Sequence, residues 1–477
     1  MVFVPTDDVA RIRAQIDHPV IDADGHQIEF MPLVRDHVVE LAGEDAAQRL
    51  DEMVSSGTRV LQQAPGDERR RRGLFRTGWW SVPTRNTLDR ATCTIPSLLY
   101  QRLDEIGIDY AVLYPTYGFF AGLPAAPELR AVFARAFNRY SVEVFDGLRD
   151  RLEPVAVIPM TDPAEAVAEL HYAVKELGLK AVMLSGIVAR PWPGAEESSA
   201  KWMDTLAHDS PFDYEPVWRA CAELGVAPGF HSGGQGWGTR MSTVNYLYNH
   251  LGSFGAAAET SARALFFGGV PRRHPELRFV FLEGGVAWAA ALHADLLGHW
   301  EKRNGTAVLH YDPDVLDRAQ LDALFAEHAT GRVHDARDRL DYGIHLLSEP
   351  IADRALVDEF ASSGIRGPAD ITDTFVRQYH FGCEADDPMN AIAFDRRLNP
   401  GGVRLKAVFG SDLGHWDVPD LRGVLPEAWE LVEEGRITRE DFRDFAFANA
   451  VSLYGADFFR DTVVEGAAAA LPTLGPR

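Results

Sequence analysis

Eight short apolar runs, separated by longer amphipathic stretches, constrain the fold of this chain more than any other feature of its sequence. The runs are rich in β-branched and aromatic residues and have the length of strands. Several of the stretches between them, such as 128–148 and 163–177, repeat their apolar residues with the period of a helix. This alternation predicts strand–helix units around a parallel sheet. The predicted strands are residues 20–24, 110–114, 154–158, 180–184, 226–231, 278–283, 375–380 and 406–411.

Eight strands with helical crossovers predict a (β/α)8 barrel with long inserted loops, as a single domain over residues 1–477 with its core at about 18–460. A doubly wound sheet is the alternative, but it would require a glycine-rich phosphate loop after an early strand, and the sequence has none. Three segments are too long for ordinary loops between strands and helices, and we expect them to form lids or oligomer contacts. They are residues 36–95, 185–211 and 304–373.

Charge, hydropathy and cysteine content narrow the range of functions that this chain could have. A formal net charge of −23 argues against a nucleic-acid or anionic-membrane partner, because such surfaces are bound through clustered Lys and Arg. The apolar run at 286–292 is far shorter than the roughly 20 residues that a membrane span needs. The three cysteines, Cys93, Cys221 and Cys383, are too scattered for a disulfide framework. We expect a cytoplasmic enzyme that acts on a small molecule.

Four consecutive arginines, Arg69 to Arg72, are the exception in this acidic chain. A solvated loop is the favoured interpretation of such a run. A clamp for a phosphate or carboxylate on the substrate is the alternative.

Side chains that can bind a metal fall at the ends of the predicted strands. In a parallel barrel the reactive groups lie at the carboxyl ends, so these side chains should meet. Asp24 and His26 follow the first strand two residues apart, and alternation puts them on one face. The other candidates are His231, Glu283, His380 and Asp412 at later strand ends, with Glu29 and His415 in the adjoining loops. Together they predict a metal site.

Four motifs resemble the amidohydrolase-2 family, a branch of the amidohydrolase superfamily related to aminocarboxymuconate-semialdehyde decarboxylase. The motifs are VIDADGH at 20–26, RLDEIGIDYAVLYP at 102–115, FLEGG at 281–285 and FGSDLGH at 409–415, and the resemblance covers about residues 18–460. It implies a distorted (β/α)8 barrel with a divalent metal held by Asp24, His26, His231 and Asp412. The habit of the family and the long insertions favour a homo-oligomer.

Two positions depart from the family pattern. Hydrolytic and decarboxylating members commonly have His-x-His on the first strand and a catalytic His on the sixth, where this chain has Asp24 and Glu283. A bridging carboxylated lysine is not expected either, because Lys180 stands at the start of its strand.

The complete candidate set is rich in carboxylates: Asp24, Glu29, Glu283 and Asp412, with His26, His231 and, in reserve, His380. Several carboxylates favour a pair of iron ions, or iron with manganese, over a single zinc. In this respect the chain is similar to a small group of non-haem di-iron oxygenases built on the same fold. The favoured hypothesis is an O2-dependent monooxygenase that hydroxylates a small organic or natural-product substrate.

The alternative is a redox-neutral enzyme, either a hydrolase or a non-oxidative decarboxylase of a carboxylic acid, in which one metal polarises the substrate or its water. Asp412 would then be a ligand or general base and His415 a proton shuttle, with Glu283 as the third catalytic candidate. Family membership favours this alternative, whereas the ligand chemistry favours the oxygenase.

Overall fold

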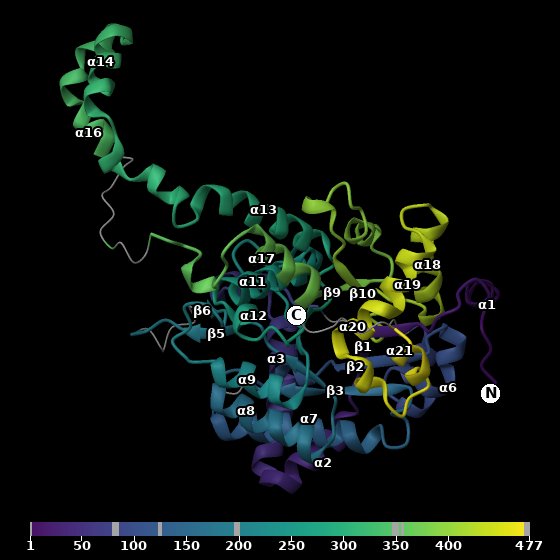
Figure 1. Ribbon diagram of the computed structural model, residues 1–477. Helices are drawn as coiled ribbons and strands as arrows, with labels where there is room; N and C mark the ends of the chain where they lie inside the picture. Colours follow the sequence, from purple (N-terminus) through teal and green to yellow (C-terminus); the bar gives the residue numbers. More distant parts are fainter. Residues whose placement is uncertain are drawn as a thin grey trace.

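A parallel sheet curled into a nearly closed barrel forms the centre of the protein (Figure 1). The computed structural model describes residues 2–78, 85–122, 126–194, 201–345, 353 and 357–471. Its eight strands follow the order β1-β2-β3-β4-β7-β8-β9-β10, and every adjacent pair is parallel. They are β1 (Ile21–Gln27), β2 (Tyr110–Pro115), β3 (Leu152–Ile158), β4 (Ala181–Leu184), β7 (Pro228–Phe230), β8 (Phe279–Phe281), β9 (Tyr379–Glu384) and β10 (Lys406–Gly410).

The seam of the barrel joins the end of β10 to β1. Asp412 N donates to Asp24 O and His26 N donates to Leu413 O, both at 2.9 Å. Strand β2 is buried along its whole length, as expected where one face of a strand meets the barrel interior and the other meets helices. The predicted (β/α)8 barrel is therefore confirmed.

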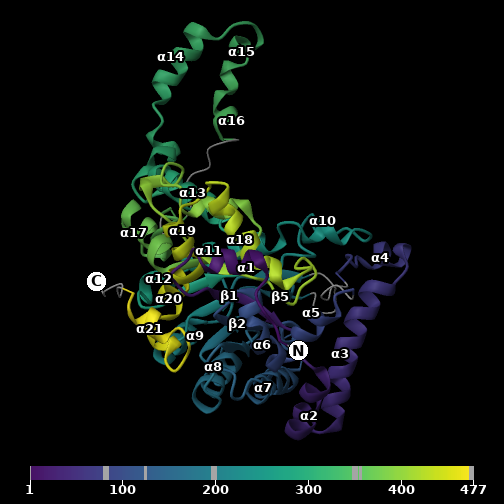
Figure 2. The same ribbon diagram turned by 90° about the vertical axis from the view of Figure 1, so that its right-hand side faces the viewer.

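Helices cover the outside of the barrel (Figure 2). Several begin with proline in their first turn, where a missing N–H costs nothing, and α6 and α9 end at Gly107 and Gly225 in the left-handed region. The helices packed around the strands are α6 (Pro96–Ile106), α7 (Pro127–Val144), α8 (Pro163–His171), α9 (Glu215–Leu224), α11 (Ser253–Phe267), α12 (Val270–Arg273), α13 (Ala287–Arg303), α17 (Pro368–Asp373), α18 (Val424–Glu433), α19 (Arg439–Arg443), α20 (Asn449–Tyr454) and α21 (Glu465–Ala469). Within the described ranges, every helix is too short or too polar to pass through a lipid bilayer.

The seventh strand lies further along the chain than predicted. Residues 375–380 were expected to form it, but Thr374–Gln378 continue the helix before β9 as a π turn, so the strand runs from Tyr379 to Glu384. Phe375 is buried there among helix and sheet residues, and an apolar residue in such a position fits either element. The shift moves His380 from the end of a strand to its beginning.

The insertions form structures of their own. The first carries α2 (Met31–Ala42), α3 (Glu44–Gln63), α4 (Gly66–Arg72) and α5 (Thr87–Thr92), while α1 (Asp7–Arg13) precedes the barrel and α10 (Tyr246–His250) lies near α4 (Figure 2). The second contains the hairpin β5 (Val188–Pro191) and β6 (Lys201–Asp204). In the third, α14 (Arg318–His328), α15 (Gly331–Asp335) and α16 (Leu340–His345) form an arm that extends away from the barrel (Figure 1).

The four arginines lie in helix α4, so the expectation of a loop is wrong. Arg69 is buried and its Nε donates to Ala64 O at 2.7 Å. Arg70 and Arg72 pair with Asp67 and Glu68 one turn earlier on the same exposed helix. These contacts are local, and pairs of this kind contribute little to stability.

Candidate metal centre

The end of the first strand positions Asp24 and His26 in the barrel mouth, where both are buried. Asp22 holds this segment against β10, because its carboxylate accepts hydrogen bonds from Ser411 N at 2.9 Å and Ser411 Oγ at 2.5 Å. Gly25 between the two candidate ligands has no room for a side chain, since a Cβ there would lie 2.6 Å from Asp22 Oδ2. The segment is thus fixed in one arrangement, with its two metal-binding side chains aimed at the same space.

Side chains from other strand ends converge on the same point. His26 Nε2 lies 3.2 Å from His231 Nε2 and 3.4 Å from Asp412 Oδ1. Asp24 Oδ1 lies 3.7 Å from each of the two imidazole nitrogens. Ligands that sit about 2.1 Å from one ion are themselves roughly 3.0 to 3.4 Å apart, by the geometry of tetrahedral and octahedral coordination. The separations among Asp24, His26 and His231 are close to those of ligands around a single ion, and Asp412 adjoins this group at His26.

Glu283 and His415 border this group of four. Glu283 Oε2 lies 3.3 Å from His231 Nε2. His415 Nδ1 lies 2.7 Å from Asp412 Oδ1, and its ring centroid is 4.0 Å from that of His26. All three residues that we predicted as catalytic, Asp412, His415 and Glu283, therefore belong to the same buried cluster.

The donor atoms of the cluster fit a cation. Among the described residues, Asp24 Oδ1, Glu283 Oε2 and Asp412 Oδ2 are buried carboxylate oxygens that accept no hydrogen bond. Buried polar atoms usually have partners, and leaving a charged one without any is costly. A divalent cation bound among these oxygens would remove that cost.

Burial also shifts the pKa values of the residues in the cluster. Burial raises the pKa of Asp24, Glu283 and Asp412 well above the usual carboxyl values, and the neighbouring carboxylates raise it further. Burial lowers the pKa of His26 and His231 well below the usual value, so both imidazoles are neutral, which is the form that binds metals. Burial also lowers the pKa of His415 to about 4. The cluster thus joins neutral imidazoles to carboxylates that lack countercharge.

Two of the carboxylates stand on strained backbone. Glu283 has φ 55° and Asp412 has φ 49°, both in the left-handed region that side chains other than glycine rarely adopt. Asp24 supports both positions, because its Oδ2 accepts from Glu283 N at 3.1 Å and its carbonyl accepts from Asp412 N at 2.9 Å. Strain of this kind concentrates at functional sites, where the surrounding structure holds it in place.

Two predicted ligands lie outside the cluster. Glu29 is occupied elsewhere, because its carboxylate accepts backbone hydrogen bonds from Gly118, Tyr117 and Thr116 at 2.8, 2.9 and 3.1 Å. His380 stands near the start of β9, at the opposite end of the barrel, with Nε2 3.3 Å from Ser452 Oγ. The structure corrects both assignments: Glu29 holds the loop after β2, and His380 belongs to the far end.

Glu384 lies near the cluster but was not among the predicted site residues. It ends β9 at the carboxyl rim, and burial together with nearby carboxylates, Asp417 first among them, raises its pKa to about 8. In the sequence it looked like part of a solvated acidic turn, since the predicted strand ended four residues earlier. The alternating pattern of 379–384 was the signal that would have placed it.

Aromatic rings wall the space above the cluster. The ring centroid of Phe119 is 4.6 Å from that of His231, and that of Phe254 is 5.6 Å from it. Trp416, which follows His415, contacts His250 edge to face at 5.6 Å. An apolar wall keeps water from competing with a substrate and strengthens the interactions of the charged groups below it.

Comparisons with known proteins identify the family of this chain. No curated protein matches the chain. A solved structure of 2,6-dihydroxybenzoate decarboxylase complexed with 2,6-dihydroxybenzoate is 15% identical, with a TM-score of 0.50 over 92% of this chain and 99% of that chain. An amidohydrolase from Mycobacterium avium subsp. paratuberculosis K-10 is 18% identical, with a TM-score of 0.51 over 92% of this chain and 100% of that chain. A family model described as Amidohydrolase matches residues 96–334, half of the chain, and the protein therefore belongs to the amidohydrolase family.

Proposed function

We propose that this protein is a metal-dependent enzyme that removes CO2 from a small carboxylic acid without oxidation. The observation that carries the proposal is the convergence of Asp24, His26 and His231 at separations close to those of ligands around one ion, with Asp412 beside His26. Two carboxylates and two neutral imidazoles suit a single divalent ion such as zinc or manganese. Loss of Glu29 and His380 from the predicted ligand set weakens the case for a second ion.

In this proposal the four residues hold the ion and Glu283 handles the proton. When bound, the ion supplies positive charge against the substrate oxygens, which stabilises the electron pair left on carbon. The bond between that carbon and the carboxylate breaks, CO2 leaves, and Glu283 Oε2 gives its proton to the carbon. Burial raises the pKa of Glu283 well above the usual carboxyl value, which favours a proton on this side chain, and its Oε2 has no hydrogen-bond partner among the described residues.

His415 and the aromatic wall have supporting roles in this scheme. His415 Nδ1 contacts Asp412 Oδ1 at 2.7 Å and so orients that carboxylate. Phe119 and Phe254 exclude water from the face of the cluster where a planar substrate would lie. The substrate in the solved decarboxylase of the same fold, 2,6-dihydroxybenzoate, is a planar carboxylic acid and is the first compound to test.

The di-iron monooxygenase remains the second candidate, because the described carboxylates and imidazoles form two overlapping groups. One contains Asp24, His26 and His231, and the other contains His26, Glu283, Asp412 and His415. Two such groups, which share His26, would hold two ions, and the several carboxylates among them favour iron. The number of ions per chain separates the two candidates.

Metal content and CO2 release test the proposal together. Protein purified without added metal is expected to carry about one ion per chain by inductively coupled plasma mass spectrometry, and to release CO2 from hydroxybenzoates equally well with and without O2. His231→Ala should lower metal content more than about tenfold. Lys180→Ala is the matched control, since Lys180 donates to Phe458 O far from the cluster. Two iron ions per chain with O2 uptake would replace the decarboxylase by the oxygenase.

A further inference from the structure

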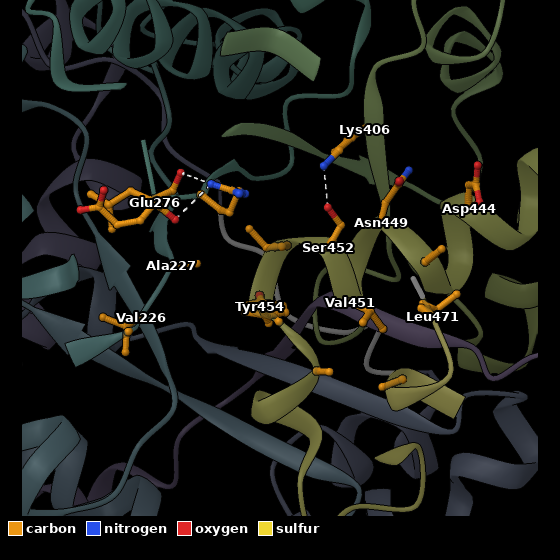
Figure 3. Close-up of a pocket in the computed structure, with 18 of the residues that line it drawn as sticks. Val226, Ala227, Glu276, Lys406, Asp444, Asn449, Val451, Ser452, Tyr454 and Leu471 are labelled. Carbon is orange, nitrogen blue, oxygen red and sulfur yellow. Dashed lines mark hydrogen bonds between the residues drawn. The ribbon is translucent and has the colours of Figure 1, made fainter. Parts of the chain in front are cut away.

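A second cavity lies at the amino ends of the barrel strands, opposite the metal cluster (Figure 3). Its volume is about 650 Å³, within the roughly 300 to 1,000 Å³ of small-molecule sites. It is bounded by the start of β10, by the turn before β8 and by helices α20 and α21. Figure 3 shows Lys406 and Ser452 together on one side of it, with Val226, Val451 and Leu471 elsewhere on its wall.

Lys406 brings an amine without a counterion to this cavity. Its Nζ donates to Ser452 Oγ at 2.5 Å, and within the described part of the chain it has no other hydrogen-bond partner and no carboxylate partner. An ammonium has three N–H donors, so two remain for a ligand. Burial, with Arg278 and Arg377 nearby, lowers the pKa of Lys406 to about 7. An amine surrounded by other cations is stabilised in its charged form by an anion.

Two more cations line the cavity without ion pairs. Neither Arg278 nor Arg443 forms a salt bridge in the ranges that the structure describes. Arg278 instead donates Nη1 to the carbonyls of residues 275–277. Carboxylates still lie within electrostatic range of both arginines, Asp373 and Glu276 for Arg278 and Asp444 for Arg443, whereas among the described residues only arginines act on Lys406.

The two carboxylates on the wall are already engaged. Asp444 Oδ2 lies 3.0 Å from Arg404 Nη2, and Glu276 Oε1 lies 3.5 Å from His274 Nδ1. Neither carboxylate pairs with the Lys406 amine, and the charged groups that act on that amine are arginines. Among the described residues, Lys406 therefore lacks a protein anion of its own.

We propose that this cavity binds a small organic acid, with its acid group on the Lys406 amine, which Ser452 positions, and its apolar body against Val226, Val451 and Leu471. Hydrogen bonds between an ammonium and a carboxylate are about twice as strong as neutral ones, which favours a charged head group. The apolar wall distinguishes such a ligand from inorganic phosphate, which has no apolar body. The site is at the other end of the barrel from the metal cluster and does not depend on the proposed reaction.

Thermal unfolding and calorimetric titration with benzoate, octanoate, inorganic phosphate and neutral benzyl alcohol test the site. We expect benzoate or octanoate to raise the Tm of the holoenzyme, and Lys406→Met to weaken that binding about tenfold or more. Lys180→Met is the control, because Lys180 also stands beside a barrel strand at this end but does not line the cavity. An acid can also bind at the metal cluster, so dependence on Lys406 is the criterion.

Ser452→Ala keeps the test decisive if Lys406→Met does not fold. This variant removes the hydroxyl that contacts Nζ and should weaken acid binding in the same direction. Equal binding of both acids by wild type and Lys406→Met, binding of phosphate alone, or equal binding of benzyl alcohol would each overturn the proposal.

Discussion

At the scale of single residues, the metal cluster contains two kinds of side chain: the proposed metal ligands and one proposed proton donor, Glu283. Asp24, His26, His231 and Asp412 are the proposed ligands, whereas Glu283, whose Oε2 lies 3.3 Å from His231 Nε2, is the proposed proton donor. Both Glu283 and Asp412 stand on left-handed backbone, so each is placed by the fold at some conformational cost. Replacing Glu283 is expected to remove a proton donor, whereas replacing Asp412 is expected to remove a metal ligand.

Glu283→Gln is expected to lower kcat by about 10²- to 10⁴-fold while metal content stays within twofold of wild type. The amide keeps the size and the hydrogen-bonding shape of the side chain but has no proton to give. Steady-state CO2 release and metal analysis on the same preparation measure both effects. Asp412→Asn is the matched comparison and should lose the metal. If Glu283→Gln also lost it, Glu283 would be a ligand and the assigned proton donor would be wrong.

At the scale of elements, the loop after β2 is fixed by a carboxylate from the segment that follows β1. Glu29 accepts hydrogen bonds from three consecutive backbone N–H groups at 116–118, and this loop leads directly to Phe119 in the wall of the site. The cluster and its aromatic wall are therefore joined through Glu29, although Glu29 does not reach the ion. A residue that looks like a ligand in the sequence acts here as a structural anchor.

Glu29→Ala should reduce the free energy of unfolding by about 2 to 4 kcal/mol, because three N–H groups lose their buried acceptor, and should leave metal content unchanged. Urea denaturation gives the first quantity and metal analysis the second. Asp24→Ala provides the opposite pattern, with loss of metal. A folded Glu29→Ala protein without metal would return Glu29 to the ligand set.

At the scale of the whole molecule, the arm is the part that the barrel does not explain. Helix α14 has no buried residue, and the arm exposes Tyr311, Val315, Leu316, Leu324, Val333 and Tyr342. Short helices are marginal without tertiary packing. A second exposed apolar surface lies around α10, at Val244, Leu247, Tyr248 and Leu251. The homo-oligomer stays a prediction, and the exposed apolar residues of the arm suggest a second copy of the chain as the partner.

Leu316→Asp combined with Leu324→Asp is expected to convert an oligomer into a monomer, because two charges would have to be buried in the contact. Light scattering coupled to size exclusion measures the mass. Leu398→Asp, at an exposed leucine outside the arm, is the control and should leave the mass unchanged. A wild-type protein that is monomeric at all concentrations would contradict the prediction.

The barrel and most of the metal cluster could be predicted from the sequence alone. Strand-length apolar runs and the rule that parallel strands end at one rim were enough to bring Asp24, His26, His231, Glu283 and Asp412 together. Strand direction and side-chain alternation are local properties that the sequence pattern predicts. In a closed parallel sheet they bring the side chains at the carboxyl ends of the strands close together.

Other parts of the site depend on contacts between segments that are distant in the sequence. The π turn at Thr374–Gln378 moved β9 along the chain, which exchanged His380 for Glu384 at the carboxyl rim. Glu29 left the ligand set because three N–H groups from a distant loop bind it, and no pattern within its own segment records them. The number of ions also depends on separations of a few tenths of an ångström between side chains from different strands, which sequence periodicity does not specify.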